Sequence, residues 1–318
     1  MKGPVVLGID GGGTKTLAIA MEAIGAPDPE SPKGVAGPSN IAAMDPEAAG
    51  RAVIASGDQA LRCGGWTRKD VASVCAAVAG YSHEENRRRL LGQVQAAFPS
   101  AVCLLQPDYV AAYDGALAGR PGAVVIAGTG QVAYGEDGSG RGARAGGYGH
   151  LIDDAGSGYG VGRAAIAAVL KDWDSIGPQT ALTVTLGQLL NVSNSQEMIA
   201  GVYGGSIDRL RIASLARTVS DAAVMGDVVA VRLLQDAGRS LAGIAISVIS
   251  RLWAPAEPVE AATAGSLWSS LFLFDEFERE LRARLPNVKI IEPHFDPVVG
   301  AALRAMRQLD TRYDSAVN

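Results

Sequence analysis

Hydrophobic and polar positions alternate along this chain in patterns that predict strands and helices in turn. Apolar runs at 5–9 and 17–21 flank a polar, glycine-rich stretch and predict a β-hairpin. Further short apolar runs predict strands at 34–36, 71–79, 102–105, 123–127, 131–135, 259–264 and 288–291. Helical spacing predicts helices at 46–62, 84–97, 109–118, 157–173, in several segments of 180–225, and at 228–253, 267–285 and 297–309. Strands that alternate with helices in both halves indicate an α/β architecture.

A break in regular structure at 119–122 (GRPG) marks the predicted domain boundary. It gives an N-terminal domain of residues 1–118 and a C-terminal domain of residues 119–318, and the last helix is a candidate to pack back on the N-terminal domain. The second domain begins with the same order of strand, glycine turn and strand as the first, which predicts two related halves. In the long helix of the second half, Gly238 and Gly243 predict close approach of another backbone.

The turn of the first hairpin, DGGGTKT at 10–16, has a composition suited to a phosphate. Its glycines allow positive φ angles and close approach of backbone N–H groups to a ligand, and its threonines and lysine add hydroxyls and a cation. Asp10, at the end of a strand, is placed to hold Mg²⁺ through water. A P-loop is excluded because Thr14 stands where its lysine should be and a strand-like run follows where a helix is required. A tight Asp-Gly turn without a ligand is the alternative.

A second glycine turn, Gly128-Thr129-Gly130, holds the corresponding place in the second half, either as a second phosphate cradle or as a plain hairpin turn. Asp108 follows a predicted strand, where a carboxylate could accept a hydrogen bond and then the proton from a substrate hydroxyl. It could equally cap the helix that begins at Tyr109. Asp114 is the rival carboxylate, expected on a solvated helix face.

The stretch at 146–160, GGYGHLIDDAGSGYG, combines six glycines with an aromatic residue, a histidine and paired acids, and runs into a helix at Ser157. We interpret it as a ligand-binding loop, although His150 also fits a structural role. Asn40, after a Gly-Pro-Ser turn, fits either a ligand contact or an Asx turn. Residues 264–268 place Gly-Ser between a strand and a helix, which suits a flat base or an ordinary capped turn.

These motifs, in this order, resemble the N-acetylglucosamine kinase and BadF-type ATPase family of the actin-like sugar kinase superfamily. The resemblance spans residues 10–302, ending in PVVGAA, which looks like the family's PxxGAA helix start. It implies a two-domain actin-like ATPase (ribonuclease H-like) fold with an interdomain cleft that closes on its ligands. It also implies ATP and Mg²⁺ as cofactors.

The resemblance assigns roles residue by residue. Asp108 would be the catalytic base and contact the sugar, and Asp10 would hold Mg²⁺ through water. ATP and its phosphates would be bound by Gly11, Gly12, Gly13, Thr14, Lys15, Thr16, Gly128, Thr129, Gly130, Gly265 and Ser266. The sugar would be bound by Asn40, Asp108, Gly147, His150, Asp154 and Ser157. The chain departs from the family at Gln131, Asp153 and Ala155, and Ala155 replaces a glutamate beside the sugar, which leaves the exact sugar open.

Composition limits the classes of binding partner that this chain could have. A net charge of −5 and a pI near 5.3 provide no basic footprint for nucleic acid. No apolar run reaches the roughly 18 residues of a membrane span. Cys63, Cys75 and Cys103 form neither a zinc nor a disulfide pattern and are expected to be buried thiols in a reducing cytoplasm. We expect a cytoplasmic protein that binds an amino sugar and ATP, and relatives suggest a homodimer.

The first functional hypothesis is transfer of the γ-phosphate of ATP to the 6-hydroxyl of an amino sugar, with N-acetylglucosamine ahead of glucosamine and N-acetylmuramic acid. A BadF-type activator ATPase, whose dimer holds an iron–sulfur cluster through cysteines, is the alternative from another class. The three cysteines here do not lie in glycine-rich loops suited to a shared cluster. A regulatory, sugar-binding ATPase without kinase turnover is a third hypothesis.

Overall fold

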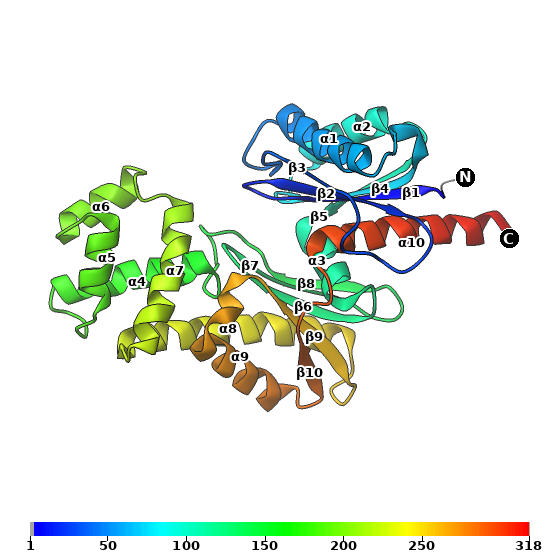
Figure 1. Cartoon of the computed structure of the whole chain (residues 1–318). Helices are drawn as coiled ribbons and strands as arrows, with labels where there is room; N and C mark the ends of the chain where they lie inside the picture. The colour runs from blue at the N-terminus through cyan, green and yellow to red at the C-terminus, as the bar shows by residue number, and fades with distance from the viewer. Residues whose placement is uncertain (1–2, 318) are drawn as a thin grey trace. The chain divides into compact units, whose positions relative to one another are not determined.

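The computed structural model describes residues 3–317, with side chains as far as Leu309. The chain forms two compact units, one made of Met1–Arg120 and Pro293–Asn318 and the other of Pro121–Glu292. The last helix, red in Figure 1, therefore belongs to the unit that also holds the blue and cyan elements. The predicted boundary, after residue 118, precedes the division that follows Arg120.

The first unit is a five-stranded sheet with helices on both faces. Its strands lie in the order β3-β2-β1-β4-β5, where β1 is Val5–Gly11, β2 is Thr16–Glu22, β3 is Lys33–Ala36, β4 is Val71–Val78 and β5 is Val102–Pro107. Helices α1 (Pro46–Cys63) and α2 (Glu84–Ala97) cover one face, and α3 (Asp108–Leu117) and α10 (Pro297–Val317) cover the other (Figure 1). A short 3-10 turn, Arg68–Asp70, precedes β4.

The second unit repeats this sheet. Its strands lie in the order β10-β9-β6-β7-β8, where β6 is Gly122–Ala127, β7 is Gln131–Glu136, β8 is Gly142–Gly146, β9 is Val259–Ala264 and β10 is Val288–Ile291. In both sheets three antiparallel strands are followed by two parallel strands. The predicted α/β class and the relation between the halves are confirmed. β8 was not predicted, because its sequence GARAG lacks the branched and aromatic residues typical of strands.

Helices of the second unit fall into two groups. Helix α8 (Val228–Leu252) contacts β6, β7 and β8, and α9 (Leu271–Arg284) packs on α8. Four more helices precede them, α4 (Gly158–Trp173), α5 (Leu182–Leu190), α6 (Ser195–Tyr203) and α7 (Arg209–Val224), and a 3-10 turn, Ser266–Ser269, follows β9. A Cβ at Gly238 would lie 2.5 Å from Leu273 O, so the predicted close approach is confirmed there. At Gly243 it is wrong, because nothing lies within 4 Å.

Two expectations about buried side chains need correction. Asp114 is 0% exposed and forms ion pairs with Arg304 (Nε to Oδ2, 2.5 Å) and Arg307 of α10. The predicted solvated face is therefore wrong, because α10 packs on that face of α3. Of the three thiols only Cys75 is buried, and burial raises the pKa of its thiol to about 12. Cys63 is exposed.

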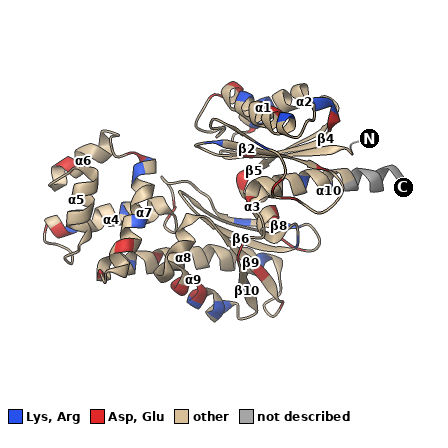
Figure 2. Ribbon diagram, in the orientation of Figure 1, with Lys and Arg blue, Asp and Glu red and all other residues tan. Residues whose placement is uncertain are grey.

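Charges are interleaved over the helices (Figure 2). On α9, Arg279 pairs with Glu276 and Arg282 with Glu278, each within one helical turn. The Arg282–Glu278 pair is largely exposed and adds little stability, whereas Glu276 is buried. In the range 3–317, no helix is long and apolar enough to cross a membrane.

Candidate active site

The first glycine turn joins β1 to β2, and Gly12 N donates to Lys15 O at 3.0 Å. None of Gly11, Gly12 and Gly13 has a positive φ, so the expected left-handed backbone is wrong. Gly11 is required for another reason, because a Cβ there would overlap Ser39 Oγ and lie 2.9 Å from Val78 Cγ1. A Cβ at Gly13 would meet nothing within 4 Å. The tip of the turn is thus open, and its base is tightly packed.

The threonines and the lysine of this turn divide into two kinds. Thr14 and Lys15 are exposed. Thr16 is 0% exposed, and its hydroxyl donates to Gly37 O at 2.7 Å and lies 2.8 Å from Ser39 Oγ. Thr14 and Lys15 are therefore available to a ligand, whereas Thr16 holds the loop at 37–39 by hydrogen bonds.

Two carboxylates stand at the ends of parallel strands of the first sheet. The pKa of Asp10 is raised to about 6, chiefly by burial and then by the nearby charge of Asp108, while the charge of Lys15 lowers it. Asp108 is the first residue of α3, and its Oδ1 accepts a hydrogen bond from Tyr109 N at 2.9 Å. Burial also raises the pKa of Asp108, although part of the residue is exposed. The two anions therefore disfavour each other's ionised form, which a bound cation would reverse.

The donor set fits a magnesium ion that keeps much of its water. Carboxylate oxygens are the ligands Mg²⁺ prefers, and it is usually held by one or two of them together with water and substrate phosphates. Among the residues that the structure describes, no three acidic, histidine or cysteine side chains form a metal cage. Asp10 would thus contribute part of a coordination shell, not all of it.

Asp296, just before α10, was not predicted as part of the site. Its charge contributes to the raised pKa of Asp10. The backbone there is held against α3, because Phe295 N donates to Gly115 O at 3.0 Å and a Cβ at Gly115 would lie 2.6 Å from Asp296 O. Its sequence signal is an acid directly before the PVVGAA helix start.

Asn40 lies on the loop beside the first turn. Its Oδ1 accepts a hydrogen bond from Ala42 N at 3.0 Å, so the Asx turn is confirmed. Ser39 N donates to Gly12 O at 3.0 Å and ties the loop to the turn. Within the described part of the chain, Asn40 Nδ2 has no hydrogen-bond partner, which leaves two donors for a ligand.

The second glycine turn is held from behind by the start of α4. Gly158 N donates to Gly128 O at 2.7 Å and Tyr159 N donates to Thr129 O at 3.4 Å. The N–H groups of Thr129 and Gly130 have no backbone acceptor among residues 3–317. A Cβ at Gly128 would meet nothing within 4 Å. Free donors and open space are what a phosphate cradle requires.

Asp154 connects this turn to the later glycine-rich stretch. Its Oδ1 accepts from Gln131 N at 2.9 Å, and its Oδ2 is buried without a hydrogen-bond partner. Burial raises the pKa of Asp154, while its hydrogen bonds and the positive charges of Arg209 and His150 lower it. One oxygen thus fixes the end of the turn, and the other is an unpaired buried acceptor.

The glycine-rich stretch has a packed part and an exposed part. Ser157 is 0% exposed, donates to Asp154 O at 2.7 Å and accepts from Gly160 N at 3.0 Å as the cap of α4. A Cβ at Gly160 would overlap Asp154 O. This second part is structural, and the expectation of a purely ligand-shaped loop is wrong for it.

The first part projects into solvent. Gly147 has φ 69° and is exposed, and Leu151 is 86% exposed. His150 is half-buried, with its ring 5.0 Å from that of Tyr159 in an edge-to-face contact. Ala155 is also exposed. Gly147 and His150 thus remain accessible to a sugar.

Gly265 follows β9 directly and has φ 108°, and a Cβ there would overlap Ala127 O at the end of β6. Ser266 is exposed and makes no side-chain cap, so the alternative of a serine cap is wrong. Exposed backbone at this point leaves a face on which a flat base could lie. Gly265 therefore stands beside the strand that leads into the second turn.

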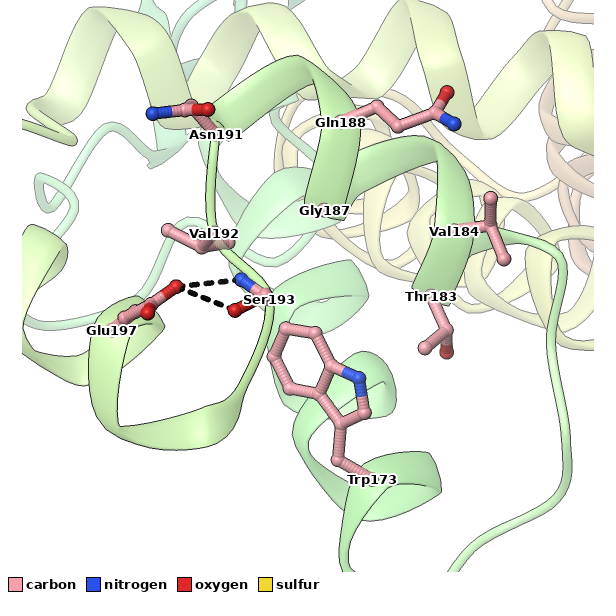
Figure 3. Close-up of a pocket in the computed structure, with 9 residues that line it drawn as sticks. All are labelled: Trp173, Thr183, Val184, Gly187, Gln188, Asn191, Val192, Ser193 and Glu197. Atoms are coloured by element: carbon pink, nitrogen blue, oxygen red, sulfur yellow. Dashed lines mark hydrogen bonds between the residues drawn. The ribbon is translucent and has the colours of Figure 1, made fainter.

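A hollow elsewhere in the second unit contains none of the predicted site residues. Figure 3 shows it between α4, α5 and α6, with a volume of about 640 Å³. Glu197 accepts there from Ser193 N at 2.7 Å and Ser193 Oγ at 3.0 Å. The residues that line it are Trp173, Thr183, Val184, Gly187, Gln188, Asn191, Val192, Ser193 and Glu197.

Each unit therefore gathers its own share of the predicted residues. Asp10, Lys15, Asp108 and Asn40 belong to the first unit, and the second turn, Asp154 and Gly265 belong to the second. Arg209 was missed by sequence reasoning. Its guanidinium Nη2 lies 3.9 Å from the position of a Cβ at Gly130.

The chain is similar to known proteins over nearly all of its length. The chain matches the model of the BadF/BadG/BcrA/BcrD ATPase family over residues 7–305. It is 32% identical to the N-acetylmuramic acid/N-acetylglucosamine kinase of Clostridium acetobutylicum, covering 96% of this chain and 99% of the relative. It is 28% identical to the N-acetyl-D-glucosamine kinase of Dictyostelium discoideum, with coverages of 96% and 99%.

A crystal structure of a proposed N-acetylglucosamine kinase from Chromobacterium violaceum superposes with a TM-score of 0.76 at 24% identity. It covers 95% of this chain and 99% of the other. This superposition supports the predicted two-domain fold, and the sequence matches bear out the resemblance.

Proposed function

The chain belongs to the BadF/BadG/BcrA/BcrD ATPase family, and on that basis we propose that it transfers the γ-phosphate of ATP to the 6-hydroxyl of an amino sugar. The observation that carries the proposal is the pair Asp10 and Asp108, whose carboxylates lie at strand ends close enough to raise the pKa of Asp10 beside the exposed Lys15. Phosphoryl transfer depends on such positioning and charge placement more than on covalent chemistry.

Asp108 would be the base. Its Oδ1 is oriented by Tyr109 N, and its raised pKa makes it a better proton acceptor than an ordinary carboxylate. It would accept the hydrogen bond of the sugar hydroxyl and take the proton as the new P–O bond forms. Asp10 would hold Mg²⁺ through water, and this ion would neutralise charge on the phosphates.

Nucleotide phosphates would be bound by the open parts of both turns. In the first turn these are the backbone of Gly11, Gly12 and Gly13 and the side chains of Thr14 and Lys15. In the second turn they are the free N–H groups of Thr129 and Gly130 together with Gly128. Gly265 and Ser266 would support the adenine base of ATP. Thr16 would act indirectly, by holding the loop that carries Asn40.

The sugar would contact Asn40, Gly147 and His150, with Asp154 and Ser157 holding the loop that presents them. N-acetylglucosamine is the first candidate, because both curated relatives reported above carry it in their names. N-acetylmuramic acid is the second, because the Clostridium acetobutylicum relative acts on it by name. The exposed Ala155 leaves room beside the sugar for a larger substituent.

A coupled ADP-release assay with MgATP tests the proposal against N-acetylglucosamine, glucosamine, N-acetylmuramic acid, N-acetylmannosamine and glucose. A rate that depends on one amino sugar, with the phosphate located on its 6-oxygen by mass spectrometry, is the expected result. ADP release unaffected by every sugar would contradict the kinase and favour an activator or regulatory ATPase. No ADP release at all would contradict both.

The same proposal includes a cytoplasmic homodimer, as the family resemblance implies. Light scattering of the purified protein should give twice the chain mass of 32.7 kDa. A monomer at that mass would refute the dimer and leave the kinase proposal intact.

A further inference from the structure

Arg209 is the first residue of α7, and α7 is locked onto the second glycine turn through α4. A Cβ at Gly162 of α4 would overlap Ile212 O of α7. A Cβ at Gly158 would lie 3.1 Å from both Ala213 O and Gly128 O. Because these glycines let three backbones meet, the start of α7 has a fixed place beside the turn.

The guanidinium of Arg209 lies over that turn. From the position of a Cβ at Gly130, Arg209 Nη2 is 3.9 Å away and Asp154 Oδ2 is 3.6 Å away. An atom at that position, one bond from the Cα of Gly130, would be in ordinary van der Waals contact with both side chains. A ligand seated on Gly130 would therefore meet the guanidinium.

Helix stability does not account for an arginine at this position. A cation in the first turn of a helix opposes the macrodipole. Asp208, and not Arg209, caps α7, accepting from Arg211 N at 2.8 Å. Arg209 is exposed, and no described residue forms a hydrogen bond or ion pair with it. Its side chain is free to bind a ligand.

The unpaired oxygen of Asp154 is the second observation at this site. Asp154 is 4% exposed, and its Oδ2 has no partner although its Oδ1 fixes Gln131 N. The charge of Arg209 acts on this carboxylate. The carboxylate attracts the guanidinium without forming an ion pair with it, which leaves the guanidinium N–H groups free for a ligand.

We propose that Arg209 binds the terminal phosphates of the nucleoside triphosphate seated on the second glycine turn. This inference rests on the proposed function and adds to it a cation from helix α7. The free N–H groups of Thr129 and Gly130 supply neutral donors, and Arg209 supplies the charged, forked donor that matches phosphate oxygens. A nucleoside monophosphate lacks the groups that Arg209 contacts.

Calorimetric titration of MgATP, ADP and AMP into the full-length chain tests the inference. Arg209→Met should weaken MgATP binding roughly tenfold or more, as expected for loss of a charge-assisted hydrogen bond. The affinity of this variant for AMP should stay within about threefold of wild type, because the adenine base and the first phosphate would bind elsewhere. The MgATP affinity of Arg209→Lys should fall between those of wild type and Arg209→Met, since lysine keeps the charge and loses the forked pair of donors.

Arg217→Met is the matched control. Arg217 is an exposed arginine on the same helix with no described partner, and its replacement should leave every nucleotide affinity unchanged. Wild-type circular dichroism and melting temperature for Arg209→Met would show that α7 keeps its place.

Three outcomes overturn the inference, and they are distinguishable. MgATP affinity of Arg209→Met within threefold of wild type would show that Arg209 makes no phosphate contact. Equal losses for AMP and ATP would show that the residue acts through the docking of α7. Absence of any nucleotide binding by the wild-type chain would overturn the proposed function as well.

Discussion

The two glycine turns occupy the same place in sheets of the same topology, yet they obtain their charges differently. In the first turn the carboxylate is Asp10, in the strand itself, and the cation is Lys15, in the turn itself. In the second turn the carboxylate is Asp154, from a later loop, and the cation is Arg209, from a helix later still.

This difference shows that a repeated sheet reproduces positions and not chemistry. The first turn is complete within one short stretch of sequence. The second is completed by close packing of backbones at Gly158 and Gly162, which brings α4 and α7 to it. If the comparison is sound, substitutions in the first turn should act locally and strongly, and matched substitutions in the second turn should act weakly on stability.

The largest expected effect tests whether the first unit holds the reacting group. Asp108→Asn should lower kcat by about 10²–10⁴-fold, because the amide cannot accept the hydroxyl proton. Sugar affinity, measured by calorimetry, should change by no more than about threefold. Asp275→Asn, an exposed acid on α9, should leave kcat unchanged. A kcat for Asp108→Asn above about a tenth of the wild-type value would show that Asp108 is not the catalytic base.

Alanine at one glycine of each turn compares the two directly. Gly11→Ala should lose about 3 kcal/mol of unfolding free energy, because its methyl would overlap Ser39 Oγ and crowd Val78. Gly128→Ala should change it by no more than about 0.5 kcal/mol, because nothing lies within 4 Å of its Cβ. Urea denaturation measures both. Equal losses in the two variants would contradict the different packing of the turns.

The pH dependence of stability isolates the carboxylate of the first turn. The folded pKa of Asp10 is raised from 3.8 to about 6, so its contribution to stability is fully present below 3.8 and is lost as pH rises through about 6. Without Mg²⁺, the stability of Asp10→Asn relative to wild type should therefore grow by about 2 kcal/mol between pH 4 and pH 8. Melting curves across this range measure it. A constant difference, like that expected for Asp275→Asn, would show that Asp10 does not titrate in this way.

The smallest expected effect compares the threonines of the turns. Thr16→Val should cost about 1 kcal/mol, because the hydrogen bonds of the Thr16 hydroxyl to Gly37 O and to the buried Ser39 Oγ are lost. Thr129→Val should cost no more than about 0.5 kcal/mol, because that side chain is exposed. The sugar KM should rise in Thr16→Val, since the loop carrying Asn40 is loosened. An unchanged KM would separate Thr16 from the sugar site.

The same contrast explains how far the sequence could be interpreted. Most strands, the first turn and the position of Asp108 were predicted because their signals are local: apolar runs, turn glycines and an acid at a strand end. Asp114 was misplaced because its helical spacing carries no trace of Arg304 and Arg307, which reach it from the far end of the chain. Arg209 left only one weak signal, a cation at a helix start, because its place depends on how α7 packs.

The position of α10 has a consequence for the order in which the two units fold during synthesis. A Cβ at Gly8 in β1 would lie 2.6 Å from Val298 O, and one at Gly300 would lie 2.9 Å from Gly115 Cα, so α10 rests directly on the sheet and on α3. The first unit is therefore incomplete until α10 has left the ribosome. The second unit is one continuous segment, Pro121–Glu292, and can complete its core earlier. On the ribosome, the first unit is therefore begun before the second and completed after it.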